Sequence, residues 1–162
     1  MRTPALLLVV TLLAGCGFAL RGANVLPENL RDLYLVAPTE LRSQVEVFLE
    51  GSRTRLVERR DAASVVLSMV NPRYDRRVLS VDPTTGKERE FELSYTVDVS
   101  ATARDGSPLL TPQPVTLLRD YVFDRDALIG ASREEGVLRD EMRRDAVRQV
   151  LLRLRAAAGH AG

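Results

Sequence analysis

Hydrophobic and polar side chains alternate strictly along residues 90–103. Because a strand directs successive side chains to opposite faces, this pattern predicts a long strand with one buried and one solvated face, as in an antiparallel sheet. A turn-rich run precedes the strand at 82–86 and another follows it at 105–108. The apolar side chains occupy the odd positions Phe91, Leu93, Tyr95, Val97, Val99, Ala101 and Ala103.

Two other segments have the 3.6-residue period of an amphipathic helix. In the first, residues 38–51, Thr39 is placed to cap the N terminus and Gly51 to end the helix. The second covers residues 132–157. The apolar stripes are formed by Leu41, Val45, Phe48 and Leu49 in the first helix and by Leu138, Met142, Ala146, Val147, Val150, Leu151 and Leu154 in the second.

Three further segments rich in Val and Leu read as strands, which gives the order β-α-β-β-β-α. They cover residues 30–36, 64–81 and 115–123. Two helices with one apolar stripe each and a sheet with one apolar face fit an α+β fold. The prediction is a two-layer sandwich, with two helices on one face of an about four-stranded, mostly antiparallel sheet.

The N terminus has the signature of an exported lipoprotein. One basic residue, Arg2, precedes an apolar run at 5–13 that is too short to span a bilayer. Leu13-Ala14-Gly15-Cys16 then looks like the bacterial lipobox, in which the cysteine thiol receives diacylglycerol. This divides the chain into a removed signal peptide (1–15), a lipidated tether (16–29), one α+β domain (30–157) and a disordered tail (158–162).

Charge and composition exclude several classes of function. A formal net charge of +1 argues against a general nucleic-acid binder. One cysteine and one histidine cannot build a disulfide framework or a thiolate or imidazole metal cage, so neither a metal nor a cofactor is expected. His160 lies near the chain end, and Glu88, Glu90 and Glu92 are better explained as a solvated strand face than as catalytic carboxylates. We therefore expect no enzymatic activity.

The residues around the lipobox indicate a particular family. The run Cys16-Gly17-Phe18-Ala19-Leu20-Arg21, together with the order of elements, resembles the start of lipopolysaccharide-assembly lipoproteins of the LptE family. That resemblance implies a lipid-anchored protein of the outer membrane that lies on the periplasmic side, inside the lumen of the LptD β-barrel. It also implies that the protein helps the barrel assemble, plugs it and binds lipopolysaccharide. Gly17 favours the outer membrane, because Asp at that position tends to retain enterobacterial lipoproteins in the inner membrane.

The resemblance also places candidate ligand contacts near the turn that precedes the long strand. The candidates are Arg76, Arg77, Thr84, Thr85, Lys87 and Arg89, with Arg133 in a later loop. Arginine forks match phosphate groups well. For Arg77 and Arg89 the alternative is an ordinary cross-strand pair with a glutamate.

Two questions stay open at this level. Arg119 falls among apolar positions of its strand, so it either discourages edge-to-edge aggregation or pairs with a carboxylate of the barrel partner. The alternative function is a lipoprotein pilot for another outer-membrane channel, or a periplasmic inhibitor. Co-purification of a large β-barrel distinguishes these functions.

Overall fold

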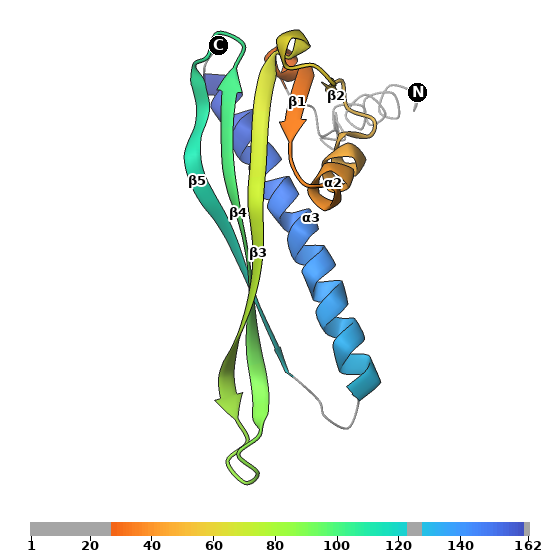
Figure 1. The fold of residues 1–162 in the computed structure, drawn as a ribbon, viewed down its shortest axis with the longest axis vertical. Helices are drawn as coiled ribbons and strands as arrows, with labels where there is room; N and C mark the ends of the chain where they lie inside the picture. The colour runs from red at the N-terminus through yellow and green to blue at the C-terminus, as the bar shows by residue number, and fades with distance from the viewer. Residues whose placement is uncertain (1–26, 123–127, 161–162) are drawn as a thin grey trace, which may run out of the picture.

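The computed structural model is an elongated α+β molecule in which a long hairpin projects at one end (Figure 1). It describes residues 27–122 and 128–160. For residues 28, 128–133 and 160 only the backbone is described. Cys16 and the segments predicted for residues 1–26 therefore lie outside the described residues. The elements are η1 (Glu28–Leu30), β1 (Asp32–Val36), α2 (Thr39–Leu49), β2 (Arg55–Leu56), η2 (Arg60–Ala62), β3 (Val65–Val81), β4 (Glu88–Ala103), β5 (Pro108–Val122) and α3 (Leu128–His160).

The sheet has five strands in the order β2-β1-β3-β4-β5, not about four. The additional strand, β2, is two residues long, which is too short to give an alternating pattern in the sequence. The strands β3, β4 and β5 are antiparallel neighbours, as expected. In contrast, β1 runs parallel to both β2 and β3, because the intervening helix α2 returns the chain to the same end of the sheet.

The core lies between one face of this sheet and the two helices, which confirms the predicted two-layer class. On β4 the odd positions from Phe91 to Ala101 are all buried, while the even positions are partly exposed. The stripe of α3 packs against them from Met142 to Leu154. From α2, the side chains of Leu41, Val45 and Leu49 complete the core.

A bulge in β3 divides the sheet into two regions. Val70 pairs with Asp98 and Arg73 with Thr96, so β3 uses one more residue than β4 between these points. Asn71 has a φ of 53° there, a left-handed conformation that Asn tolerates better than most residues. We call the part of the sheet before this bulge, with β1 and β2, the proximal half, and the part from the bulge to the hairpin turn the distal half.

The helix ends differ from the sequence predictions. Pro38, and not Thr39, is the N-cap of α2, and no side chain caps this helix. At the other end of the chain, α3 continues to His160, beyond the predicted end at 157. Ala158 is buried, and its carbonyl oxygen accepts a hydrogen bond of 3.1 Å from the Asn29 side chain. This packing keeps residues 158–160 helical, where the sequence analysis predicted a disordered tail.

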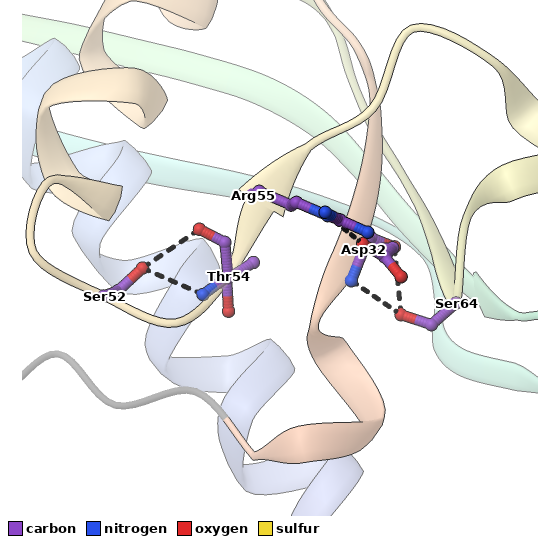
Figure 2. A network of polar contacts seen from close by, with 5 residues as sticks. All are labelled: Asp32, Ser52, Thr54, Arg55 and Ser64. Atoms are coloured by element: carbon purple, nitrogen blue, oxygen red, sulfur yellow. Dashed lines mark hydrogen bonds and ion pairs between the residues drawn. The ribbon is translucent and has the colours of Figure 1, made fainter.

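Side chains tie the strand ends together at the proximal end of the sheet (Figure 2). The Ser64 hydroxyl donates to the Asp32 carbonyl oxygen (2.9 Å) and accepts from the Asp32 amide (3.0 Å), which joins β3 to β1. Arg55 of β2 pairs with the Asp32 carboxylate at 2.5 Å. These contacts fix a two-residue strand that backbone pairing alone would hold weakly.

Candidate functional site: the distal hairpin

The turn that joins β3 to β4 is organised by Asp82. Its carboxylate accepts hydrogen bonds from the amides of Thr84 (2.9 Å) and Thr85 (2.8 Å) and from the Thr85 hydroxyl (3.1 Å). These hydrogen bonds, led by the one from the Thr85 amide, hold the pKa of Asp82 below its usual range. Gly86 closes the turn with a φ of 65°, which favours glycine. The amides of the candidates Thr84 and Thr85 are thus already committed within the turn.

Two cations flank this turn. Lys87 and Arg89 are exposed, and neither forms an ion pair within the part of the chain that the structure describes. Exposed aliphatic side chains lie next to them on β3: Val78 (43%), Leu79 (44%) and Val81 (54%). Figure 1 shows that the hairpin extends past the end of α3, so no helix among the described residues covers this tip. The tip therefore combines available positive charge with uncovered apolar surface.

The candidates Arg76 and Arg77 lie on opposite faces of the sheet. Arg77 pairs across the strands with Glu92 at 2.7 Å on the uncovered face, which is the cross-strand alternative considered above. Arg76 points to the helix side, where its guanidinium lies 4.3 Å from the centre of the Phe91 ring and 3.5 Å from a carboxylate oxygen of Glu135. The predicted cluster of four cations is therefore split, and only Lys87 and Arg89 remain at the tip.

Glu135 of α3 is the centre of a polar network that the sequence analysis missed. The hydroxyl of Tyr121 donates to it at 2.8 Å and Arg139 pairs with it at 2.5 Å, in addition to Arg76. Partial burial raises the pKa of Glu135, but these partners outweigh it, so the pKa lies below its usual value of 4.5. The only sequence signal was the Glu135–Arg139 spacing of four residues, which is common on helix surfaces.

Tyr74 extends this network along the sheet. Its hydroxyl donates to the Arg139 carbonyl oxygen at 3.0 Å, and its ring lies against the ring of Tyr95 with 4.5 Å between the centres. The distal half is thus held to α3 by aromatic rings, two arginines and one carboxylate. We call this set the polar clasp, formed by Tyr74, Arg76, Phe91, Tyr121, Glu135 and Arg139.

The structure identifies the partner of Arg119 but does not describe the side chain of Arg133. Arg119 lies on the helix side of β5 and pairs with Asp145 of α3 at 2.6 Å. Its partner therefore comes from the same chain, so the structure gives no support for pairing with a carboxylate of the barrel. Arg133 falls within α3, where its side chain is not among those described.

A shallow groove of about 340 Å³ lies beside the tip, between Leu79 of β3, Glu90 of β4 and residues 120–122 of β5. Its lining includes the carboxylates of Glu90 and Asp120, which repel phosphate. Any phosphate contact near this end is therefore assigned to the cations at the tip and not to the groove.

The face of the sheet opposite the helices is polar and uncovered within the described residues. Hydroxyl side chains of Thr96 and Thr116 share a hydrogen bond of 3.0 Å, and Arg73 pairs with Asp98 at 3.1 Å. Across 27–122 and 128–160, no helix is both long and apolar enough to cross a membrane. The same residues contain no group of three or more potential metal ligands.

Comparison with known families decides the affiliation. A family described as LptE, lipopolysaccharide-assembly, matches residues 30–154. The chain belongs to this family. The resemblance first noted at the N terminus is thereby confirmed over nearly all of the α+β domain of this LptE-family chain.

Relatives of this LptE-family chain support the assignment in sequence and in structure. It is 28% identical to the LPS-assembly lipoprotein LptE of Pectobacterium atrosepticum, over 94% of this chain and 83% of the relative. It is 26% identical to the protein of the same name from Photorhabdus laumondii, over 91% and 81% of the two chains. Among solved structures, it resembles lipoprotein B of Nitrosomonas europaea, with 26% identity, a TM-score of 0.73 and coverage of 88% and 93%. Rare lipoprotein B of Shewanella oneidensis matches with 26% identity, a TM-score of 0.71 and coverage of 80% and 98%.

Proposed function

We propose that this protein is an outer-membrane lipoprotein, acylated at Cys16, that works in lipopolysaccharide assembly as the partner of an LptD-like β-barrel. In this role it faces the periplasm, lies in the barrel lumen and binds lipopolysaccharide. The role requires binding and not turnover, so no catalytic group is assigned. The family match supports the general role, and the geometry of the hairpin tip carries the assignment of ligand contact.

Lipopolysaccharide offers phosphates and acyl chains close together, and the tip presents the complementary groups. Lys87 and Arg89 form no ion pair among the described residues. They can therefore bind a phosphate without breaking an internal salt bridge. The aliphatic side chains of Val78, Leu79 and Val81 provide apolar surface beside these cations. Arg76 is already engaged in the polar clasp and is assigned a structural role.

The uncovered sheet face is the surface we assign to the barrel. Both helix stripes are used in covering the other face, so docking through a large apolar helix surface is excluded from the proposal. A face built from hydroxyl groups and paired charges suits a wet lumen, where many modest hydrogen bonds hold two proteins together. Single truncations on such a surface are expected to have small effects.

Affinity purification from detergent-solubilised outer membrane tests the proposal. We expect a large β-barrel to co-purify, and intact-mass analysis to show a chain that begins at Cys16 and carries acyl groups. Thr96→Ala should leave the barrel bound, whereas T96R/T116R should release it, because two bulky charges on this face cannot be accommodated inside a closed lumen. Circular dichroism of each variant controls for folding.

Three results would contradict the proposal. An unmodified Cys16 would remove the anchor. Capture of a different channel would instead support the alternative of a pilot lipoprotein. Loss of the barrel on Thr96→Ala alone would show a hot-spot interface and overturn the assignment of a wet, distributed surface.

A further inference from the structure

A second polar surface lies at the proximal end, on the opposite side of the molecule from the hairpin tip. It is an open groove of about 460 Å³, which we call the arginine groove, and no residue of the proposed barrel-contact pair Thr96 and Thr116 lines it. The groove is lined by Arg60, Asp61, Ala63, Val66, Thr102, Ala103, Arg104 and Gly106. Its residues come from η2 and the residue that follows it, the start of β3, the end of β4 and the β4–β5 turn.

The backbone of the groove is firmly built. The Arg104 amide donates to the Ser64 carbonyl oxygen at 3.0 Å, which ties the β4–β5 turn to the start of β3. The Arg104 side chain donates to the Asp61 carbonyl oxygen at 3.2 Å, which ties the same turn to η2. Ala63 is buried beneath these groups. The two arginines are therefore presented by fixed backbone segments.

The carboxylates at the groove are already engaged within the fold. Asp61 pairs with Arg59. Asp105, in the same turn as Arg104, accepts hydrogen bonds from the Ser107 amide (2.9 Å) and hydroxyl (2.6 Å). The hydrogen bond from Arg59 and the nearby charge of Arg104 hold the pKa of Asp61 below its usual value, so the carboxylate is already compensated. Arg60 forms no ion pair within the described residues, and the one side-chain acceptor of Arg104 is a neutral carbonyl. A guanidinium has five N–H donors, so most of those on these two arginines remain available.

The groove therefore fits a phosphate that carries a small apolar group. Arginine forks bind phosphate oxygens through paired hydrogen bonds. The methyl groups of Ala63, Val66 and Ala103 provide apolar surface in the groove. A phospholipid phosphodiester, which is flanked by the CH₂ groups of its ester linkages, has this combination of charge and apolar surface.

The position of the groove relative to the anchor indicates the source of that phosphate. The first described residue, Pro27, leads into η1, whose Asn29 contacts the end of α3 at the proximal end. The chain between the proposed anchor at Cys16 and Pro27 spans at most about 40 Å. The strand β4 alone covers about 50 Å. The tether therefore lets the proximal end reach the leaflet that contains the acyl groups. It is too short for the domain to stand on that leaflet with the hairpin tip down, because the tip lies about a strand length from the proximal end.

We propose that the arginine groove binds the phosphodiester headgroups of anionic lipids in the leaflet that holds the anchor. This would orient the domain, with the hairpin tip directed away from that leaflet. The inference rests on the proposed anchor at Cys16, but it concerns a different ligand and a groove at the proximal edge of the uncovered sheet face, away from Thr96, Thr116 and the hairpin tip.

Vesicle binding of the chain from residue 17 onward, which lacks the acyl groups, tests this proposal. We expect co-sedimentation with phosphatidylcholine–phosphatidylglycerol vesicles and little with pure phosphatidylcholine. R60Q/R104Q should weaken binding to the mixed vesicles by about 25-fold, since each arginine at a membrane surface contributes about a five-fold factor. The matched control R144Q/R148Q removes the same charge from exposed positions in the middle of α3 and should change binding little.

The remaining arms separate the alternatives. Equal losses for R60Q/R104Q and R144Q/R148Q would show attraction by net charge alone and would overturn the proposal, as would a loss confined to K87Q/R89Q. Loss of inorganic phosphate binding in R60Q/R104Q together with unchanged vesicle binding would show that the groove takes a free phosphate ion, which also overturns the proposal. Circular dichroism confirms the fold of each variant. Barrel co-purification with acylated R60Q/R104Q should persist, so failure here is distinguishable from failure of the proposed function.

Discussion

The helix α3 contacts the sheet through two different kinds of interface. In the proximal half, Leu67, Met69, Val97 and Val99 of the sheet are packed in a dry core that also contains Val150 and Leu151 of α3. In the distal half, the core continues through Phe91, Leu93 and Tyr121, and the polar clasp adds hydrogen bonds and ion pairs to it. The helix α3 and the three strands β3, β4 and β5 run through both regions, so the difference arises from side chains and not from topology. We infer that the proximal half supplies the stability of the fold and that the distal half presents the hairpin.

The sharpest way to break this comparison is to remove equivalent apolar volume from each half. Leu67→Ala in the fully buried proximal core should destabilise the protein by about 2–5 kcal/mol, because it leaves a cavity. Leu79→Ala, at a side chain that is 44% exposed, should cost less than about 0.5 kcal/mol. Urea unfolding followed by circular dichroism measures both changes. Equal costs would contradict the division into a stabilising half and a presenting half.

The next largest effect is expected in the polar clasp. Glu135→Gln removes the charge that Arg76 and Arg139 share in a site where the glutamate side chain is only 19% exposed. The expected cost at neutral pH is about 1–3 kcal/mol, because two guanidinium groups lose a charged acceptor.

The pH dependence of this variant identifies the interaction. The pKa of Glu135 is lower in the folded protein than its usual 4.5, so the carboxylate contributes stability above that value and loses it as the pH falls through the folded pKa. The difference in unfolding free energy between the native protein and Glu135→Gln should therefore shrink as the pH is lowered below about 4.5. A difference that stayed constant from neutral pH to that range would contradict an electrostatic role.

The bulge between the two halves should respond to backbone chemistry. Asn71 has a positive φ, and its side chain donates to the Asp98 carboxylate at 3.1 Å. Asn71→Ala should cost about 1 kcal/mol, since alanine lacks the short polar side chain that lets Asn tolerate the left-handed region and the contact with Asp98 is lost. Asn71→Gly should cost less, because glycine adopts this φ freely. Thermal unfolding of the two variants checks the order, and the reverse order would show that the bulge is not set by backbone conformation.

The smallest effect is expected where the two halves meet. The Tyr95 side chain is fully buried, and its hydroxyl has no hydrogen-bond partner among the described residues. Tyr95→Phe should therefore leave stability unchanged or raise it slightly, because an unpaired polar group is removed from the core. A clear loss of stability in urea unfolding would indicate a buried partner for this hydroxyl.

The features that could be predicted from the sequence were the elements with long periodic patterns of apolar residues. The alternation along β4 placed its buried face correctly, and the stripe from Met142 to Leu154 placed α3. The phase of β3 could not be read in this way. Its inward positions are odd up to Met69 and even from Tyr74 onward, because the bulge at Asn71 inserts one residue.

The candidate site was predictable only in part, for a related reason. The neighbours Arg76 and Arg77 are adjacent in sequence, but strand geometry sends them to opposite faces, where each finds a glutamate. One of those glutamates, Glu135, lies far along the chain on α3, so no local pattern could indicate it. Arg119 and Asp145 illustrate the same limit, since their pairing depends on how α3 crosses β5.

Lipopolysaccharide binding by K87Q/R89Q tests the central claim most directly. The variant should fold with the stability of the native protein, because neither side chain forms an ion pair among the described residues. Its affinity for lipopolysaccharide should fall and depend less steeply on salt concentration, since exposed charges attract over roughly 8–10 Å in physiological salt. The matched variant R144Q/R148Q should bind like the native protein. Undiminished binding by folded K87Q/R89Q, or an equal loss in R144Q/R148Q, would contradict the assignment of the ligand to the hairpin tip.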